Sequence, residues 1–159
     1  MRTLNAGIYR VLRFVITVLI AVMIVPVTLQ IASRFVEFIP RYIWTEEIAR
    51  FCFIWMVMVG AMCAARDGTH FEVDVLPTPA TARGNALARM IVHVGVLAMA
   101  LIFSWYGVPF AQFGSIQESE MTGINMLTMY IAWPLAGIVW VLFTVEHLAD
   151  DVKLYVDGR

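Results

Sequence analysis

Hydrophobic residues in this chain gather into four long runs that are separated by polar segments. The runs cover about residues 12–34, 47–66, 86–110 and 124–147. Each has about 20 residues or more, the length that a helix needs to cross the ~30 Å hydrocarbon core of a bilayer. The pattern therefore predicts an all-α membrane protein with four transmembrane helices in one membrane domain, residues 1–159.

The segments between the runs predict how the helices are connected. Residues 34–44 mix aromatic and charged side chains with Pro40, so we expect a short interfacial arm before the second helix. Thr78 and Pro79 have the residue types of a helix cap and a first turn, which puts the start of the third helix before the third run. A helix from there to Phe110 would be ~48 Å long. We therefore expect an extended start that lies along the cytoplasmic membrane surface.

The distribution of basic residues predicts the orientation of the helices. Most of the Lys and Arg residues fall in the terminal segments and in the loop between the second and third runs. Because cytoplasmic loops carry the excess of Lys and Arg, the N and C termini and the middle loop are expected in the cytoplasm. The residues on that side are Arg2, Arg10, Arg13, Arg66, Arg83, Arg89, Lys153 and Arg159, against Arg34, Arg41 and Arg50 on the other.

Composition agrees with a membrane protein and argues against other classes. Of the 159 residues, 61% are hydrophobic and 14% are charged, whereas soluble domains have roughly 25% charged residues. The formal net charge of −1 gives no reason to expect nucleic acid as a partner. The sequence contains no nucleophile with its base, no phosphate loop and no nucleotide fingerprint, so we do not expect an enzyme.

The two cysteines are expected to stay unpaired. Cys52 and Cys63 lie on the same predicted helix, where their separation would be ~16 Å, too far for a disulfide. They match no metal-binding spacing, and we interpret them as small apolar residues of that helix.

The middle of the four runs is almost free of ionisable side chains. The one candidate is His93, about two turns into the third run, and no Asp, Glu, Lys or Arg lies at mid-depth. Ionisable groups inside a membrane usually mark a pathway for ions or substrate, and coupled transporters usually show paired interrupted helices as well. We therefore expect that this chain does not move a solute by itself.

Three histidines fall toward the expected cytoplasmic side: His70, His93 and His147. A haem or metal site between helices is one interpretation, because imidazole ligates both. The simpler interpretation is that each is an interfacial histidine bonded to a carbonyl or an acid. We favour the simpler one and expect no cofactor.

The second run begins with a cluster of aromatic and charged residues. Trp44 is followed by Glu46 and Glu47, and Arg50 lies four residues after Glu46, a spacing at which helical side chains meet. An exposed pair of this kind contributes only ~0.3–0.5 kcal/mol, so stability alone gives it little purpose. Two interpretations stay open, namely a polar contact with a partner chain and the solvated border of a helix.

The same run ends in small residues and then a polar exit. Gly60 and Ala64 have the small-xxx-small spacing on which another helix can lie close. The polar residues Arg66, His70 and Asp74 follow and mark where the chain leaves the bilayer.

These residues together resemble a known family. Their order and spacing are similar to those of the small membrane subunit of tripartite ATP-independent periplasmic (TRAP) transporters, the DctQ-like family, and the length and number of spans agree along the whole chain. The residues that carry the resemblance are Trp44, Glu46, Glu47, Arg50, Gly60, Ala61, Arg66, His70, Val73 and Asp74.

The resemblance implies a subunit of a heteromeric transporter in the bacterial inner membrane. Its partners would be a large DctM-like membrane subunit, which holds the substrate and sodium sites, and a periplasmic substrate-binding protein. The imported solute would be an organic acid of the C4-dicarboxylate, keto acid or sugar acid type. The small subunit would act as a fixed brace for the large one.

The resemblance also implies residue roles. Glu46, Glu47 and Arg50 would order the periplasmic end of the second helix or contact a partner, and Gly60 would allow close packing. The residues that would fix the cytoplasmic turn are Arg66, His70 and Asp74.

Two hypotheses compete with this resemblance. One is a haem-carrying membrane anchor of a respiratory enzyme, and the other is a stand-alone small channel or scaffold.

Overall fold

The computed structural model describes the whole chain except residues 1, 37, 39, 41, 69–81 and 158–159. The described part contains helices and no strand, and four of its helices are long and apolar enough to cross a membrane. The predicted all-α membrane fold with four spanning helices is therefore confirmed. The helices are α1 (Arg2–Phe35), α2 (Trp44–Asp67), α3 (Ala82–Ser115), α4 (Leu127–Tyr130) and α5 (Ala132–Asp157).

The long helices extend beyond the hydrophobic runs that predicted them. α3 has 34 residues and is therefore ~51 Å long, more than a ~30 Å hydrocarbon core requires. It begins before the third run, as expected, whereas its predicted cap at Thr78 and Pro79 lies outside the described residues. α2 ends at Gly68, whose φ of 73° is a left-handed conformation that glycine adopts without strain.

The fourth spanning helix begins later than its hydrophobic run. Ile124 belongs to the connecting loop, and Oδ1 of Asn125 accepts a hydrogen bond from the Leu127 N–H at 2.8 Å just before α4 begins. The helix is then interrupted between α4 and α5. Pro134 has no N–H to donate to the carbonyl of Tyr130, which explains the interruption.

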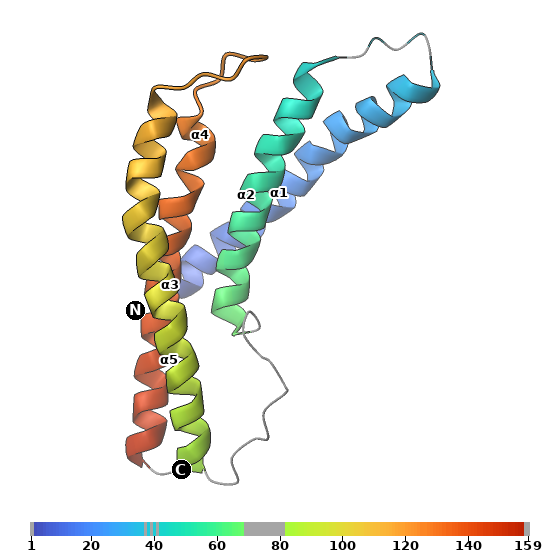
Figure 1. Ribbon diagram of the computed structural model, residues 1–159. Coiled ribbons are helices and arrows are strands. Elements are labelled where there is room, and N and C mark those ends of the chain that lie inside the picture. The colour runs from blue at the N-terminus through green and yellow to red at the C-terminus, as the bar shows by residue number, and fades with distance from the viewer. Residues whose placement is uncertain (1, 37, 39, 41, 69–81, 158–159) are drawn as a thin grey trace.

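The helices are arranged as two pairs. α3 and α5 run side by side along their length, and the sloping α1 is accompanied by α2 (Figure 1). Contacts between α2 and α5 connect the pairs. Toward the top of Figure 1 the α1/α2 pair leans away from the α3/α5 pair. We call that end, which contains the described residues between α1 and α2 and the segment 116–126, the loop end.

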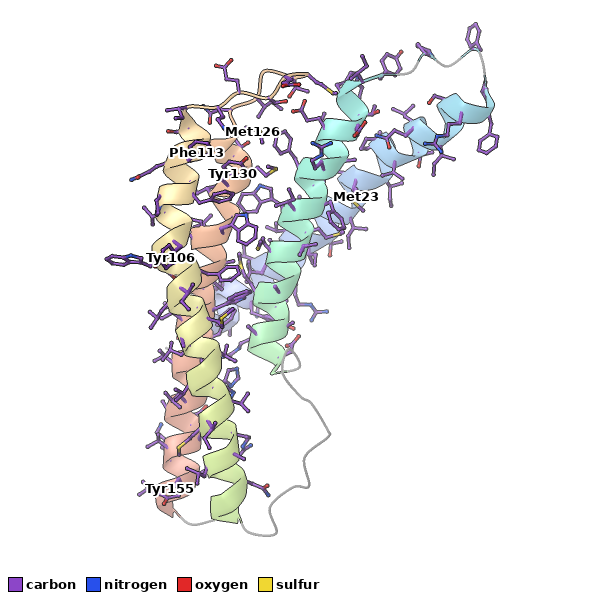
Figure 2. The ribbon with its side chains drawn as sticks, in the orientation of Figure 1. Met23, Tyr106, Phe113, Met126, Tyr130 and Tyr155 are labelled. Carbon is purple, nitrogen blue, oxygen red and sulfur yellow. The ribbon has the colours of Figure 1, made fainter. Side chains whose placement is uncertain are left out.

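The α3/α5 pair packs closely because glycines lie at its contact points. A Cβ atom added at Gly137 would lie 2.6 Å from the backbone nitrogen of Ser104, and one at Gly107 would lie 2.8 Å from the backbone nitrogen of Pro134. Both distances are shorter than real Cβ atoms allow, so these positions require glycine. Near the loop end the ring of Tyr130 on α4, labelled in Figure 2, stacks on the ring of Phe110 on α3, with centroids 4.3 Å apart.

The hydrophobic core lies where α2 meets α5. Met58 and Met62 of α2 are buried against Ala132 and Ala136 of α5. Trp55 packs against this cluster and donates its Nε1–H to the carbonyl of Thr128 at 2.9 Å. Trp55 is partly buried, and this bond connects α2 to α4.

Candidate functional site

A buried carboxylate on α5 joins three helices at the end of the bundle opposite the loop end. Glu146 is 8% exposed. One of its carboxylate oxygens lies 3.0 Å from the guanidinium of Arg66 on α2, and the other accepts a hydrogen bond from the side-chain amide of Asn5 on α1. The same amide nitrogen lies 3.4 Å from the carbonyl oxygen of Leu142. The charge of Glu146 is thus compensated, as a buried carboxylate requires.

A second buried carboxylate connects α5 to α3 slightly further along. Asp151 is 4% exposed. Its Oδ2 lies 2.6 Å from Nδ1 of His93, and its Oδ1 lies 3.4 Å from Nε of Arg89. Because an ionised carboxylate can only accept hydrogen bonds, Nδ1 of His93 carries the donated proton. Asn5, Arg66, His93, Glu146 and Asp151 together are called the charged end below.

His147 connects the two carboxylate sites. Its Nε2 lies 3.1 Å from the backbone carbonyl oxygen of Arg66, and a carbonyl accepts, so Nε2 is the protonated nitrogen. The ring is stacked on that of His93, with centroids 5.4 Å apart and an angle of 12° between the planes. Both hydrogen bonds are of the kind that the simpler interpretation predicts, one to an acid and the other to a carbonyl, whereas the interfacial position of these residues stays a prediction.

The contact between the two rings bears on the haem hypothesis. Axial ligation by two histidines requires that the rings lie on opposite faces of the macrocycle. His93 and His147 are instead stacked on one another, which leaves no space for a macrocycle between them. Nor do the two parallel rings direct lone pairs to one point, as a shared metal ion would require.

One further polar contact joins α1 to α2 beside the charged end. The hydroxyl of Tyr9 donates a hydrogen bond of 2.9 Å to Oδ2 of Asp67, and the guanidinium of Arg13 lies 5.8 Å from the centre of the Tyr9 ring. These side chains are solvent-exposed, and their contribution to stability is accordingly small.

Of the three polar residues predicted to mark where the chain leaves the bilayer, Arg66 is among the described residues. Arg66 contacts α5 through the carboxylate of Glu146. This ion pair therefore connects α2 to α5. His70 and Asp74 lie outside the described residues, so the predicted fixing of the turn stays a prediction.

The pair predicted at the start of α2 is present. Arg50 lies 3.1 Å from Oε1 of Glu46, and the two side chains are 63% and 66% exposed. The ring of Trp44 lies 5.8 Å from that of Tyr42, at an angle of 47°. The local geometry is therefore as expected, whereas a contact with a partner chain stays a prediction.

Glu47 differs from its neighbour Glu46. One oxygen of its carboxylate, Oε2, is buried and has no hydrogen-bond partner among the described residues. A buried acceptor without a partner is unfavourable, and Oγ1 of Thr122 is a second such atom at the loop end.

The small residues of α2 pack against α1. A Cβ atom added at Gly60 would lie 3.5 Å from Cδ1 of Ile16, which is an ordinary van der Waals contact. Ala64 is partly exposed. Much closer approaches occur at Gly107, Gly114 and Gly137, which spacing alone did not distinguish from other glycines.

Sequence reasoning also missed the buried acids. Glu146 falls at the end of the fourth run and Asp151 beyond it, and no prediction was made for either residue or for Asn5. The signal was present as a concentration of ionisable residues at one helical end. Those residues are Glu146, His147, Asp150 and Asp151.

Comparisons with known proteins agree on one family. The family model described as "Tripartite ATP-independent periplasmic transporters, DctQ component" matches residues 23–154. A TRAP transporter small permease protein of Haemophilus influenzae is 29% identical over 160 residues, which cover 100% of this chain and 98% of the relative. The sialic acid TRAP transporter small permease protein SiaQ of Vibrio cholerae is 26% identical, with 88% of this chain and 81% of the relative covered.

A longer relative contains a similar segment. The isethionate TRAP transporter permease protein DctMQ of Oleidesulfovibrio alaskensis is 25% identical over 114 residues. The match covers 70% of this chain but 18% of that relative, so the similar segment is a small part of a longer permease chain.

Proposed function

The chain belongs to the DctQ component family of tripartite ATP-independent periplasmic transporters, and we propose that it braces a larger membrane subunit without binding the solute itself. It is a transporter component and a multi-pass protein of the inner membrane. The proposal concerns its role within the transporter.

The observation that carries the proposal is the location of charge. No Asp, Glu, Lys or Arg occurs at positions 14–33 of α1, 51–65 of α2, 94–115 of α3 or 132–145 of α5. The buried acids of the charged end are already bound by side chains of this chain, Glu146 by Arg66 and Asp151 by His93. A coupled transporter needs ionisable or coordinating groups near the middle of the membrane. The described helices have no charged side chain at that depth.

An exposed apolar stripe on α1 agrees with a partner chain in the membrane. Five apolar side chains at spacings of three and four residues form a stripe along this helix and are all exposed. In a bilayer such a stripe is covered by lipid or by helices of another chain. The stripe consists of Val11, Phe14, Val18, Val22 and Val25.

The relatives support the finer part of the proposal. Two of their names refer to sialic acid and to isethionate, which are organic acids, and one longer relative is a permease that contains a segment similar to this chain. We infer that the large partner is a DctM-like subunit and that a periplasmic binding protein delivers an organic acid. Import is driven by sodium, with both termini of the small subunit in the cytoplasm.

Co-purification and omission test this function. The tagged chain, extracted from its native membrane, should retain a much larger membrane subunit. Proteoliposomes that contain both subunits, with a sodium gradient and the binding protein, should accumulate one of a panel of C4-dicarboxylates, keto acids and sugar acids. Accumulation should be lost when the small subunit is left out. Unchanged uptake without it would contradict the bracing role.

A further inference from the structure

A polar pocket opens between the last turns of α1 and the first turns of α2, at the loop end. Its volume is about 780 Å³. Because the uncharged stretch of α1 ends at Ser33 and that of α2 begins at Phe51, the pocket lies where the helices leave the hydrocarbon core. Six of its lining residues have polar side chains: Gln30, Ser33, Arg34, Tyr42, Thr45 and Glu46.

Some of these polar groups are already used within the chain. The Ser33 hydroxyl donates to the carbonyl of Gln30 at 2.9 Å, and the Thr45 hydroxyl donates to the carbonyl of Tyr42 at 2.6 Å. Both bonds shape the pocket rather than serve a ligand. The remaining donors are the guanidinium of Arg34, the side-chain amide of Gln30 and the hydroxyl of Tyr42. This is a set that binds phosphate oxygens, with the guanidinium as the strongest member.

The pocket also contains a carboxylate. Glu46 contacts Arg50 through Oε1, and its side chain is 66% exposed, so this pair is weak. Its second oxygen, Oε2, can therefore accept a hydrogen bond from a ligand ammonium group. A cationic side chain and an anionic one thus line the same depression, which favours a ligand with both signs of charge over a simple anion.

We propose that this pocket binds the head group of a zwitterionic, ethanolamine-type phospholipid. The phosphodiester contacts Arg34, Gln30 and Tyr42, and the ammonium group contacts Glu46. The apolar lining residues Leu29 and Ile43 lie against the glycerol and the first acyl carbons. An anionic lipid without an ammonium group makes no contact with Oε2 of Glu46, and a soluble head group lacks the apolar contact.

The test uses native mass spectrometry of the full chain, together with any subunit that co-purifies. The probes are phosphatidylethanolamine, phosphatidylglycerol and soluble glycerophosphoethanolamine. One hydrogen-bonded charged contact changes affinity by roughly tenfold, so phosphatidylethanolamine should be retained about tenfold more strongly than phosphatidylglycerol. Arg34→Gln should reduce its retention by a similar factor of roughly ten. Glu46→Gln should abolish the preference between the two lipids.

A matched control is available on the same helix. Arg10 is an exposed arginine at the opposite end of α1, and Arg10→Gln should leave lipid retention unchanged. Equal retention of the two lipids by the wild type overturns the proposal, as does an unchanged Arg34→Gln variant. Binding of glycerophosphoethanolamine as tight as that of the lipid would show a site for soluble ligands instead. Because the readout is bound lipid, the result is independent of uptake and of the proposed function.

Discussion

The two ends of this molecule both contain ion pairs, but the pairs do different things. At the charged end, Arg66 and Glu146 come from different helices, are 80 positions apart and have side chains that are 21% and 9% exposed. At the loop end, Glu46 and Arg50 come from one helix and are more than 60% exposed. Only the first kind of pair can fix one helix relative to another. Together with the hydrophobic core between α2 and α5, the charged end therefore holds the two helix pairs to one another.

Removal of one partner at the charged end should have the largest effect. Glu146→Ala leaves the mostly buried guanidinium of Arg66 without a counter-charge, and the free energy of unfolding should fall by about 3 kcal/mol or more. The measurement is denaturant unfolding in bicelles, followed by circular dichroism. Glu120→Ala, at an exposed glutamate of the connecting loop, is the control and should change little.

A double variant sharpens this result. Replacement of both partners by apolar residues, Arg66→Met with Glu146→Leu, removes the buried charges together and should recover most of the lost stability. If the double variant is as unstable as Glu146→Ala, the unpaired buried charge of Arg66 is not the cause of the loss, and the ion pair does not hold α2 against α5.

The next effect is expected inside the α3/α5 pair. Gly137→Ala places a Cβ atom against the backbone of Ser104 and should destabilise the protein by ~1–3 kcal/mol. Gly95→Ala is a matched control on α3, because nothing lies within 4 Å of its added Cβ. Equal stability of the two variants in the same unfolding assay would show that α3 and α5 do not approach as closely as described.

A smaller effect is expected at the second carboxylate. Asp151→Asn removes the charge that His93 and Arg89 contact, and the loss should be ~1–2 kcal/mol, because charge-assisted bonds are exchanged for neutral ones. The variant should also lose the carboxylate-dependent chemical shift of the His93 ring, observed by ¹⁵N NMR. Glu120→Gln serves as the control, and an unchanged His93 signal would mean that Asp151 is not its partner.

The smallest effect on stability is expected at the loop end. Arg50→Ala should change the free energy of unfolding by only ~0.3–0.5 kcal/mol, because the pair is exposed. If this end contacts a partner, the same variant should nevertheless reduce the yield of the complex or uptake, without changing which solute is selected. Wild-type yield and uptake together would contradict the predicted role of Arg50.

Features that depend on neighbouring residues could be predicted from the sequence. The four spans follow from local hydrophobicity, and the contact between Glu46 and Arg50 follows from helical spacing, because both are set within a few residues. The start of the fourth spanning helix and its interruption before α5 were missed, because the hydrogen bond from the Leu127 N–H to Asn125 and the missing N–H of Pro134 override a continuous apolar run.

Features that depend on tertiary contacts could not be predicted in the same way. Asn5 and Glu146 are 141 positions apart, and nothing local in either segment indicates the other. Spacing likewise identified Gly60 as a packing residue but did not show that Gly137 lies at the closer contact. Which small residue faces which helix is decided by the packing of the whole bundle.

The most direct test of the central claim is solute accumulation by this polypeptide alone in liposomes. With a sodium gradient and labelled organic acids outside, the account predicts no accumulation above that of empty vesicles, because the helices have no charged group at mid-depth to couple ion and solute movement. Gradient-dependent accumulation of any of these solutes by the chain alone would contradict it.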